Sequence, residues 1–103
     1  MTISTTAMIQ ASVQRLFPNA SMDQAVAELL LERAQKNLIK YRSMARQFEA
    51  KYHKSFDDFR KMVLHSHPTA ETEQDYFDWE LAVTGIADME DEIARLKDLA
   101  HRS

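Results

Sequence analysis

Histidines are the residues of this chain whose type and spacing suggest metal chemistry. His65 and His67 lie two residues apart in a stretch that ends at Pro68, and the other histidines are His53 and His101. Two loop histidines can share a metal ion, but a competent site needs a third ligand at fixed geometry. The chain has no cysteine and no His-Glu-x-x-His pattern to supply one. We therefore interpret the pair as a loop feature and expect no metal and no cofactor.

Carboxylates and serines are plentiful, but their positions do not indicate catalysis. The carboxylates fall in the first turns and on the outer faces of expected helices, whereas a general acid needs a shielded pocket that shifts its pKa. No serine lies in a nucleophile motif, and Gly85 is the single glycine, so a glycine-rich phosphate loop is excluded. The sequence therefore favours a binding protein over an enzyme, with no small-molecule substrate.

The scarcity of turn-forming residues indicates long helices. The 103 residues include one glycine and two prolines, Pro18 and Pro68, whereas chains rich in tight turns need more of both. This length suits one domain with a limited core, so we expect self-association. The start of the sequence lacks the basic and long apolar segments of a secretory signal, and no stretch approaches the roughly 18 apolar residues of a membrane span. We therefore expect a cytoplasmic protein with no membrane partner.

Two long heptad patterns predict an all-α fold, an antiparallel helical hairpin of the coiled-coil type. One helix is expected over residues 21–52, beginning at Ser21 in a Ser-x-x-Gln capping box, and the other over 69–100, beginning at Thr69 or Thr72. Apolar residues recur in both at alternating spacings of three and four. The two seams are Leu31, Ala34, Leu38, Tyr41, Ala45, Phe48 and Tyr52, and Trp79, Ala82, Ile86, Met89, Ile93, Leu96 and Ala100. Such seams bury each other, so they should form the core.

A short amphipathic helix is expected to connect the two long ones. It would begin at Ser55 and end near residue 65. Leu30 and Met44 are expected to widen the first seam. Gly85 is expected off the second seam, where it would either allow a close approach of the helices or weaken the helix slightly. The apolar face of the short helix is expected at Phe56, Phe59, Met62 and Val63.

Residues 1–20 form an N-terminal arm in our interpretation, ahead of a hairpin domain at residues 21–103. The start of the chain also has the layout of a ribbon-helix-helix unit. Such a unit consists of a short strand, a helix, which here would end near Leu16, a turn and a capped second helix. In that alternative Thr2 and Ser4 would face the major groove of operator DNA. The strand lacks the Arg, Lys, Asn or Gln typical of such readers, so a helical or disordered arm, with dimerisation as another role, is favoured.

Charge is unevenly distributed along the chain. Residues 1–68 contain ten basic and six acidic residues, whereas residues 69–103 contain three and ten, for a net charge of −3. One alternative is that the halves neutralise each other in the fold, and the other is that a basic and an acidic surface serve different partners. Arg33, Lys36 and Lys40 form a basic stripe suited to nucleic acid, although a pI of about 5.8 argues against strong autonomous binding.

The segment 76–83 is apolar nearly all round, so it must be covered on more than one side. Trp79 lies on the seam, while Phe77 and Leu81 point elsewhere. One alternative is that the short helix covers the segment, and the other is that part of it faces a second protein, since large aromatic residues are favoured interface anchors. We assign Trp79 to the core. The predicted partner contact consists of Tyr76, Phe77, Asp78, Glu80 and Leu81.

Three short motifs in the chain resemble a known family. They are Phe48-Glu49-Ala50-Lys51-Tyr52, the Ser55-x-x-x-Phe59 segment, and Tyr76-Phe77-Asp78-Trp79-Glu80 before a Leu- and Ile-rich helix. Over residues 24–100 the chain resembles short helical antitoxins that partner TumE-type toxins in two-gene modules. The resemblance implies that it neutralises a basic, ribonuclease-like toxin. Residues 1–19 extend beyond the short members of that family, and one interpretation is that they form a DNA-binding arm for autoregulation. The alternative is a homo-oligomeric scaffold or transcriptional regulator without a toxin.

Overall fold

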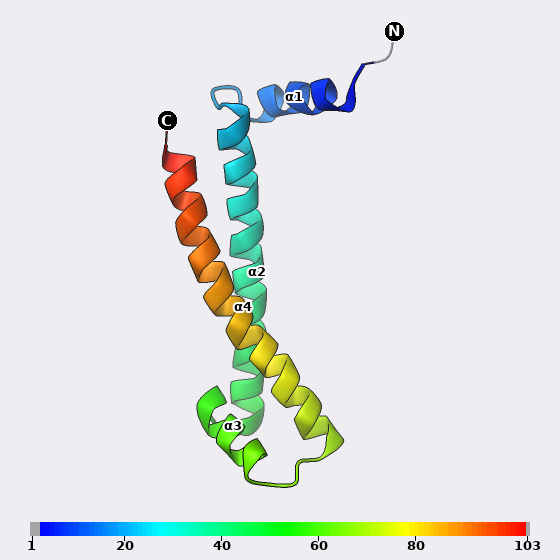
Figure 1. Cartoon of the computed structure of the whole chain (residues 1–103), viewed down its shortest axis with the longest axis vertical. Helices are drawn as coiled ribbons and strands as arrows, with labels where there is room; N and C mark the ends of the chain where they lie inside the picture. Colours follow the sequence, from blue (N-terminus) through cyan, green and yellow to red (C-terminus); the bar gives the residue numbers. More distant parts are fainter. Residues whose placement is uncertain (1–2, 103) are drawn as a thin grey trace.

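Helices account for most of residues 3–102, the part of the chain that the computed structural model describes. They are α1 (Thr5–Leu16), α2 (Met22–Tyr52), α3 (Phe56–Leu64) and α4 (Ala70–His101) (Figure 1). Pro18 and Pro68 lie in the connections before α2 and α4, since proline interrupts helical hydrogen bonding. The all-α prediction is confirmed, because residues 3–102 contain no strand and both long helices are continuous.

Polar side chains set the starts of the long helices. The Ser21 hydroxyl accepts the Gln24 backbone N–H at 3.1 Å and the Gln24 side chain accepts the Ser21 N–H at 3.1 Å, which completes the predicted capping box. Thr69 rather than Thr72 caps α4, since the Thr72 N–H donates to Thr69 Oγ1 at 3.1 Å. α2 ends at His53, whose φ of 54° places it in the left-handed region typical of helix C-termini.

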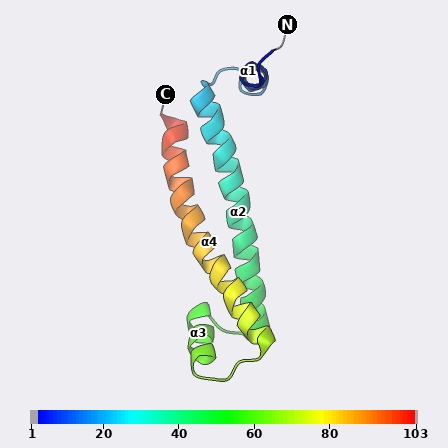
Figure 2. The same ribbon diagram turned by 45° about the vertical axis from the view of Figure 1, so that its right-hand side comes forward.

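α2 and α4 pack side by side in opposite directions, as both views show (Figures 1 and 2). The molecule measures 65 × 32 × 18 Å. Every residue of the two predicted seams is buried or half-buried, so the heptad spacing located the interface between the long helices. Leu30 does not widen the first seam as predicted, because it is 51 % exposed, whereas Met44 packs against the core.

Gly85 permits a close approach of the two long helices. It is buried, and a Cβ atom at this position would lie 2.6 Å from Cδ2 and 2.7 Å from Cγ of Tyr41. The close approach is therefore as predicted, but the placement of Gly85 off the seam is wrong. The position lies against α2, where the Tyr41 ring occupies the space that a side chain would need.

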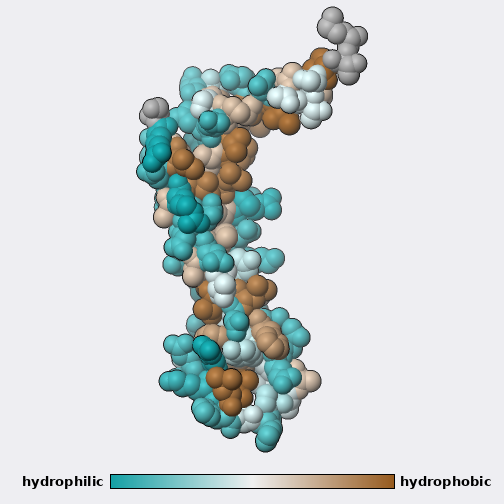
Figure 3. Space-filling view, viewed as in Figure 1, coloured by the Kyte–Doolittle hydropathy of each residue, from teal (hydrophilic) through white to brown (hydrophobic). Residues whose placement is uncertain are grey.

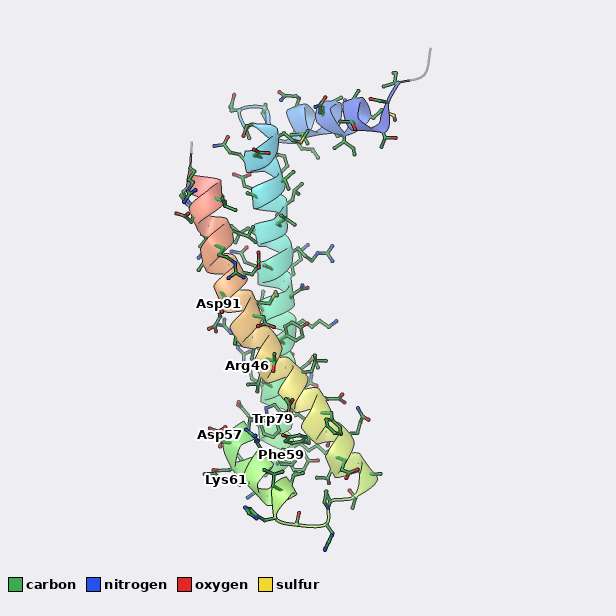
Figure 4. All side chains as sticks on the ribbon, in the orientation of Figure 1. Arg46, Asp57, Phe59, Lys61, Trp79 and Asp91 are labelled. Atoms are coloured by element: carbon green, nitrogen blue, oxygen red, sulfur yellow. The ribbon has the colours of Figure 1, made fainter. Side chains whose placement is uncertain are left out.

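The largest buried side chains lie at the closed end of the hairpin, which we define as the end where α3 connects α2 to α4. Trp79 and Phe59 are fully buried there, with ring centroids 5.1 Å apart (Figure 4). Phe48 stacks on Trp79 from α2, at 5.7 Å, and Phe56 meets it edge-on from α3, at 5.5 Å. α3 therefore covers one side of the aromatic segment as expected. The predicted contribution of Met62 is wrong, because this residue is exposed and lies outside the core.

α1 projects sideways from the other end of the hairpin (Figure 1). It contacts α2, and Val13 is its one buried residue. Ser4 caps α1 by accepting the Ala7 N–H at 3.1 Å, so this residue begins a helix. No part of residues 3–102 therefore forms the strand of a ribbon-helix-helix unit, and Thr2 lies outside the described residues. The arm is helical.

The outer faces of the long helices are largely hydrophilic in the space-filling view, which also shows hydrophobic atoms gathered near α1 (Figure 3). Basic residues outnumber acidic residues along α2, and acidic residues outnumber basic residues along α4. Among the helices of residues 3–102, none combines the length and the apolar character that crossing a membrane requires.

Candidate partner-binding site

The partner contact predicted from the sequence lies on the first half of α4. The helical period directs Trp79 into the core and directs Phe77 and Leu81, four residues apart, to the opposite side. Phe77 is 63 % exposed and Leu81 is 56 % exposed, so this apolar pair faces outward. We call this surface, together with the carboxylates that flank it along α4, the outer α4 patch. It consists of Glu73, Phe77, Asp78, Glu80, Leu81 and Asp88.

The carboxylates of the outer α4 patch keep their negative charge unneutralised. Asp78 accepts a hydrogen bond from the Gln74 side chain at 3.0 Å, and Glu73, Glu80 and Asp88 are exposed. Within residues 3–102 none of these four carboxylates forms an ion pair. The α4 carboxylates that do form ion pairs are Glu71, Asp75, Glu90, Glu92 and Asp98. A negative field therefore surrounds the exposed apolar pair, which favours a positively charged partner.

Tyr76 joins the patch to the core of the closed end. Its ring stacks on Phe56 at 5.8 Å and meets Phe77 edge-on at 5.6 Å, and the residue is half-buried. Hydrogen bonding to Glu80, together with partial desolvation, raises the pKa of the Tyr76 phenol. The hydroxyl therefore stays protonated at neutral pH. Among the five predicted contact residues, Tyr76 is the one whose ring also packs on α3.

The Phe-x-x-Lys-Tyr motif at the end of α2 has a structural role. Lys51 Nζ lies 2.6 Å from Asp75 Oδ2 and 2.9 Å from Glu71 Oε1, and the Tyr52 hydroxyl donates to the same Asp75 carboxylate. The hydrogen bond from Lys51, followed by that from Tyr52, holds the pKa of Asp75 below its usual range. These contacts connect the last turn of α2 to the first turns of α4. They therefore help to place the outer α4 patch.

The other two motifs behind the family resemblance also consist mainly of residues that stabilise the fold. Ser55 caps α3 by accepting the Asp58 N–H at 3.2 Å, and Phe59 is buried. In the Tyr-Phe-Asp-Trp-Glu motif, Trp79 is buried and Tyr76 packs on α3. The residues of that motif whose side chains are not in the core cluster are Phe77, Asp78 and Glu80. They are the part of the motif available to a partner.

The basic stripe predicted on α2 lies on the exposed surface. Arg33, Lys36 and Lys40 are spaced by three and four residues, so they share a helix face, and none forms an ion pair within residues 3–102. Arg42 instead reaches α4 and pairs with Glu90 at 3.1 Å, as Lys51 does with its own partners. Neutralisation between the halves therefore holds for Arg42 and Lys51, whereas the stripe has no ion pair within residues 3–102.

The remaining candidate groups do not assemble into a site. His65 and His67 are exposed between α3 and α4, and residues 3–102 contain no cluster of three side chains suited to a metal ion. Sequence reasoning missed exposed apolar residues at the end of the hairpin opposite α3, where α1 contacts α2 and the end of α4 lies beside the start of α2. Leu29 and Leu99 are among them, and their off-seam positions were the available signal.

No family model, curated protein or solved structure matches this chain. Its function has to be inferred from its own surfaces. The outer α4 patch stands out because it combines an exposed aromatic side chain, an exposed leucine and unneutralised charge of one sign.

Proposed function

We propose that this chain is a non-enzymatic inhibitor of the antitoxin type, which neutralises a basic, ribonuclease-like toxin through the outer α4 patch. The observation that carries the proposal is the exposure of Phe77 and Leu81 among carboxylates that have no ion-pair partner within residues 3–102. Large apolar side chains supply most of the affinity of a protein interface, while surrounding charges steer the encounter and select the partner. The motif resemblance supports the same function.

The negative charge of α4 explains how an inhibitor of a ribonuclease would work. Proteins that hold RNA present basic surfaces to its phosphates. Residues 69–103 contain ten acidic and three basic residues, so this part of the chain carries a net charge of −7. We infer that α4 occupies the basic substrate surface of the toxin and excludes RNA by competition. Such binding requires no catalytic group on this chain.

The fold holds the outer α4 patch in a defined geometry before any partner arrives. The inward side of the same helix is anchored by Trp79 in the core, by the Gly85–Tyr41 contact and by the Lys51–Asp75 ion pair. A helix anchored in this way loses little further conformational freedom on binding, which favours affinity. The two long helices therefore act as a rigid support for the patch.

The test is calorimetric binding of the purified chain to the small basic protein encoded by the adjoining gene, together with an RNA-cleavage assay. Phe77→Ala should weaken binding by about 30-fold, equivalent to about 2 kcal/mol, because it removes the apolar centre of the contact. Ile39→Ala is the matched control, since Ile39 is an exposed apolar residue on α2 outside the patch. A folded Phe77→Ala protein that binds and inhibits like the control would contradict the proposal, as would no binding by the unmodified chain.

The unneutralised stripe of Arg33, Lys36 and Lys40 favours a second function, the binding of operator DNA for autoregulation. Each phosphate contact lowers the slope of log affinity against log salt by about 0.9. Replacing all three residues by Gln should therefore make the slope shallower by up to about 3 in a gel-retardation series with the upstream DNA. A protein with Lys54→Gln, Lys61→Gln and Lys97→Gln controls for net charge, because it loses the same three charges away from the stripe. Equal slopes for the unmodified and triple-variant proteins would exclude contact through the stripe.

A further inference from the structure

The open end of the hairpin carries a continuous apolar surface. We define this end as the end opposite α3, where α1 joins α2 on one side and the end of α4 lies beside the start of α2 on the other (Figure 1). The open-end patch consists of Met8, Ile9, Val26, Leu29, Leu30 and Leu99, which are between 43 % and 60 % exposed. Hydrophobic atoms gather at this end of the molecule in the space-filling view (Figure 3). A contiguous patch of this kind marks an interaction site more often than an inert surface.

Two grooves give the open-end patch its shape. The first is an open groove of about 650 Å³ between α2 and α4, with Val26, Leu30 and Leu99 in its lining. The second is a groove of about 490 Å³ in the corner between α1 and α2, lined in part by Ile9 and Leu29. Val26, Leu29 and Leu30 lie three and four residues apart along one side of α2, so they join the two grooves. The surface is concave and can receive helices.

The core at this end is built from small side chains. The buried residues at the start of α2 are alanines, Ala25, Ala27 and Ala34, whereas the neighbouring leucines and the valine are exposed. At the closed end the arrangement is reversed, because Trp79 and Phe59 are fully buried. The start of α2 therefore leaves Val26, Leu29 and Leu30 about half exposed within residues 3–102, although Leu96 of α4 is buried at this end.

The accessible surface of the chain supports association. It measures 7809 Å² for a mass of 12.0 kDa. A compact monomer of this mass exposes only about 6,000 Å². The excess of about 1,800 Å² is in the range that one subunit of an obligate dimer buries. The radius of gyration is 20.2 Å, compared with about 13 Å for a globular chain of this length.

We propose that a second copy of this chain occupies the open-end patch, forming a two-fold dimer. The start of α2 and the end of α4 from each copy would pack as a four-helix bundle, with α1 of each copy closing over it. The lining of the larger groove includes one acid, Asp23, and one base, Arg102, and Arg102 pairs with Asp98 of α4 at 2.8 Å. A two-fold interface brings a patch against itself, so apolar side chains of one copy would meet those of the other. A strongly charged partner would not match this largely apolar lining.

This dimer is separate from the proposed toxin contact. Leu81 and Leu99 lie 18 residues apart on one helix, which separates them by about 27 Å along its axis. The two contacts also differ in character, because the outer α4 patch is acidic and the open-end patch is apolar. Salt should therefore weaken toxin binding and leave dimerisation nearly unchanged.

Sedimentation velocity tests the dimer without any toxin. At tens of micromolar, the unmodified protein should sediment at twice its 12.0 kDa chain mass. Leu29→Glu and Leu99→Glu should each weaken dimerisation by at least about 100-fold, because each places two unpaired carboxylates in the apolar contact. Ile39→Glu is the matched control on α2, and Phe77→Glu is the control on the outer α4 patch. Both controls should remain dimeric.

Three outcomes would overturn the proposal. One is a monomeric unmodified protein at these concentrations, and another is a dimer that Phe77→Glu dissociates. The third is dimerisation by folded Leu29→Glu and Leu99→Glu proteins with unchanged affinity. Circular dichroism monitors the fold, and if Leu29→Glu loses helicity, Leu99→Glu decides the outcome from the other helix. Failure of toxin binding would leave all three results unaffected.

Spin labels can place the interface directly. The chain has no cysteine, so single cysteines at Val26 and, separately, at Lys61 can be labelled without background. Lys61 lies on α3 at the closed end (Figure 4). In the proposed dimer, the distance between two Val26 labels should be much shorter than that between two Lys61 labels. The opposite order would assign the contact to the closed end.

Discussion

Trp79→Ala is the substitution that most directly tests the division of the aromatic segment between core and surface. Trp79 is fully buried, and its ring lies 5.1–6.3 Å from the rings of four aromatic residues, measured between centroids. Those four rings belong to Phe48, Tyr52, Phe56 and Phe59. They come from α2 and α3, so removing the indole would leave a cavity where all three elements of the closed end meet.

The expected cost is a large part of the total stability. A Trp→Ala change in a packed core costs about 3–5 kcal/mol, whereas a domain of this length has about 5–15 kcal/mol in all. The melting temperature should fall by about 12–40 °C, since each kcal/mol shifts it by about 4–8 °C in a small domain. Phe77→Ala is the matched comparison on the outer side of the same helix. It should cost less than about 1 kcal/mol, because Phe77 is 63 % exposed and packs edge-on against one ring.

The assay is thermal and urea unfolding followed by circular dichroism, at one protein concentration so that association does not alter the comparison. Trp79 is the sole tryptophan, so its emission should be that of a buried indole in both the unmodified and Phe77→Ala proteins. If Trp79→Ala does not fold, Trp79→Phe should retain the fold with a smaller loss. A Phe77→Ala protein that melts as low as Trp79→Ala would refute the assignment of Phe77 to the surface.

Further predictions concern three other contacts. Gly85→Ala should lower stability by about 1–2 kcal/mol, although alanine favours a helix, because the new Cβ would collide with the Tyr41 ring at its attachment carbon; an unchanged urea midpoint would contradict this. The pKa of Asp75 is lowered in the folded state, so its ionised carboxylate stabilises the fold. This contribution is complete above about pH 4, the ordinary pKa of an Asp side chain, and it is lost as the pH falls through the lower pKa of the folded state. The stability difference between the unmodified protein and Asp75→Asn should therefore shrink below about pH 4 in urea titrations. His53→Gly should raise the urea midpoint, with a gain of about 0.5–1 kcal/mol, because His53 has a φ of 54°; a lower midpoint would indicate a further role for the imidazole.

Local features of the sequence were sufficient to predict the helices and their main interface. Ser21 and Ser55 begin helices because their hydroxyls bind backbone N–H groups three residues ahead, which is a property of the adjacent sequence alone. The heptad spacing located both seams for a similar reason, since the helical period determines which side chains share a face. The same helical period placed Phe77 and Leu81 off the seam of α4, and for this reason they were predicted as contact residues.

Only the tertiary structure decided which off-seam residues are covered. Leu30 and Met62 both suit an apolar face by type and spacing, yet Leu30 is 51 % exposed and Met62 is 37 % exposed, because the rest of residues 3–102 covers them only in part. The Lys51–Asp75 ion pair joins residues 24 positions apart, and the Gly85–Tyr41 contact joins residues on different helices. Helical periodicity is a local property, whereas burial and pairing depend on how α2 and α4 pack against each other and on where α1 and α3 lie against them. That placement arises from contacts between distant segments, which no local pattern in the sequence specifies.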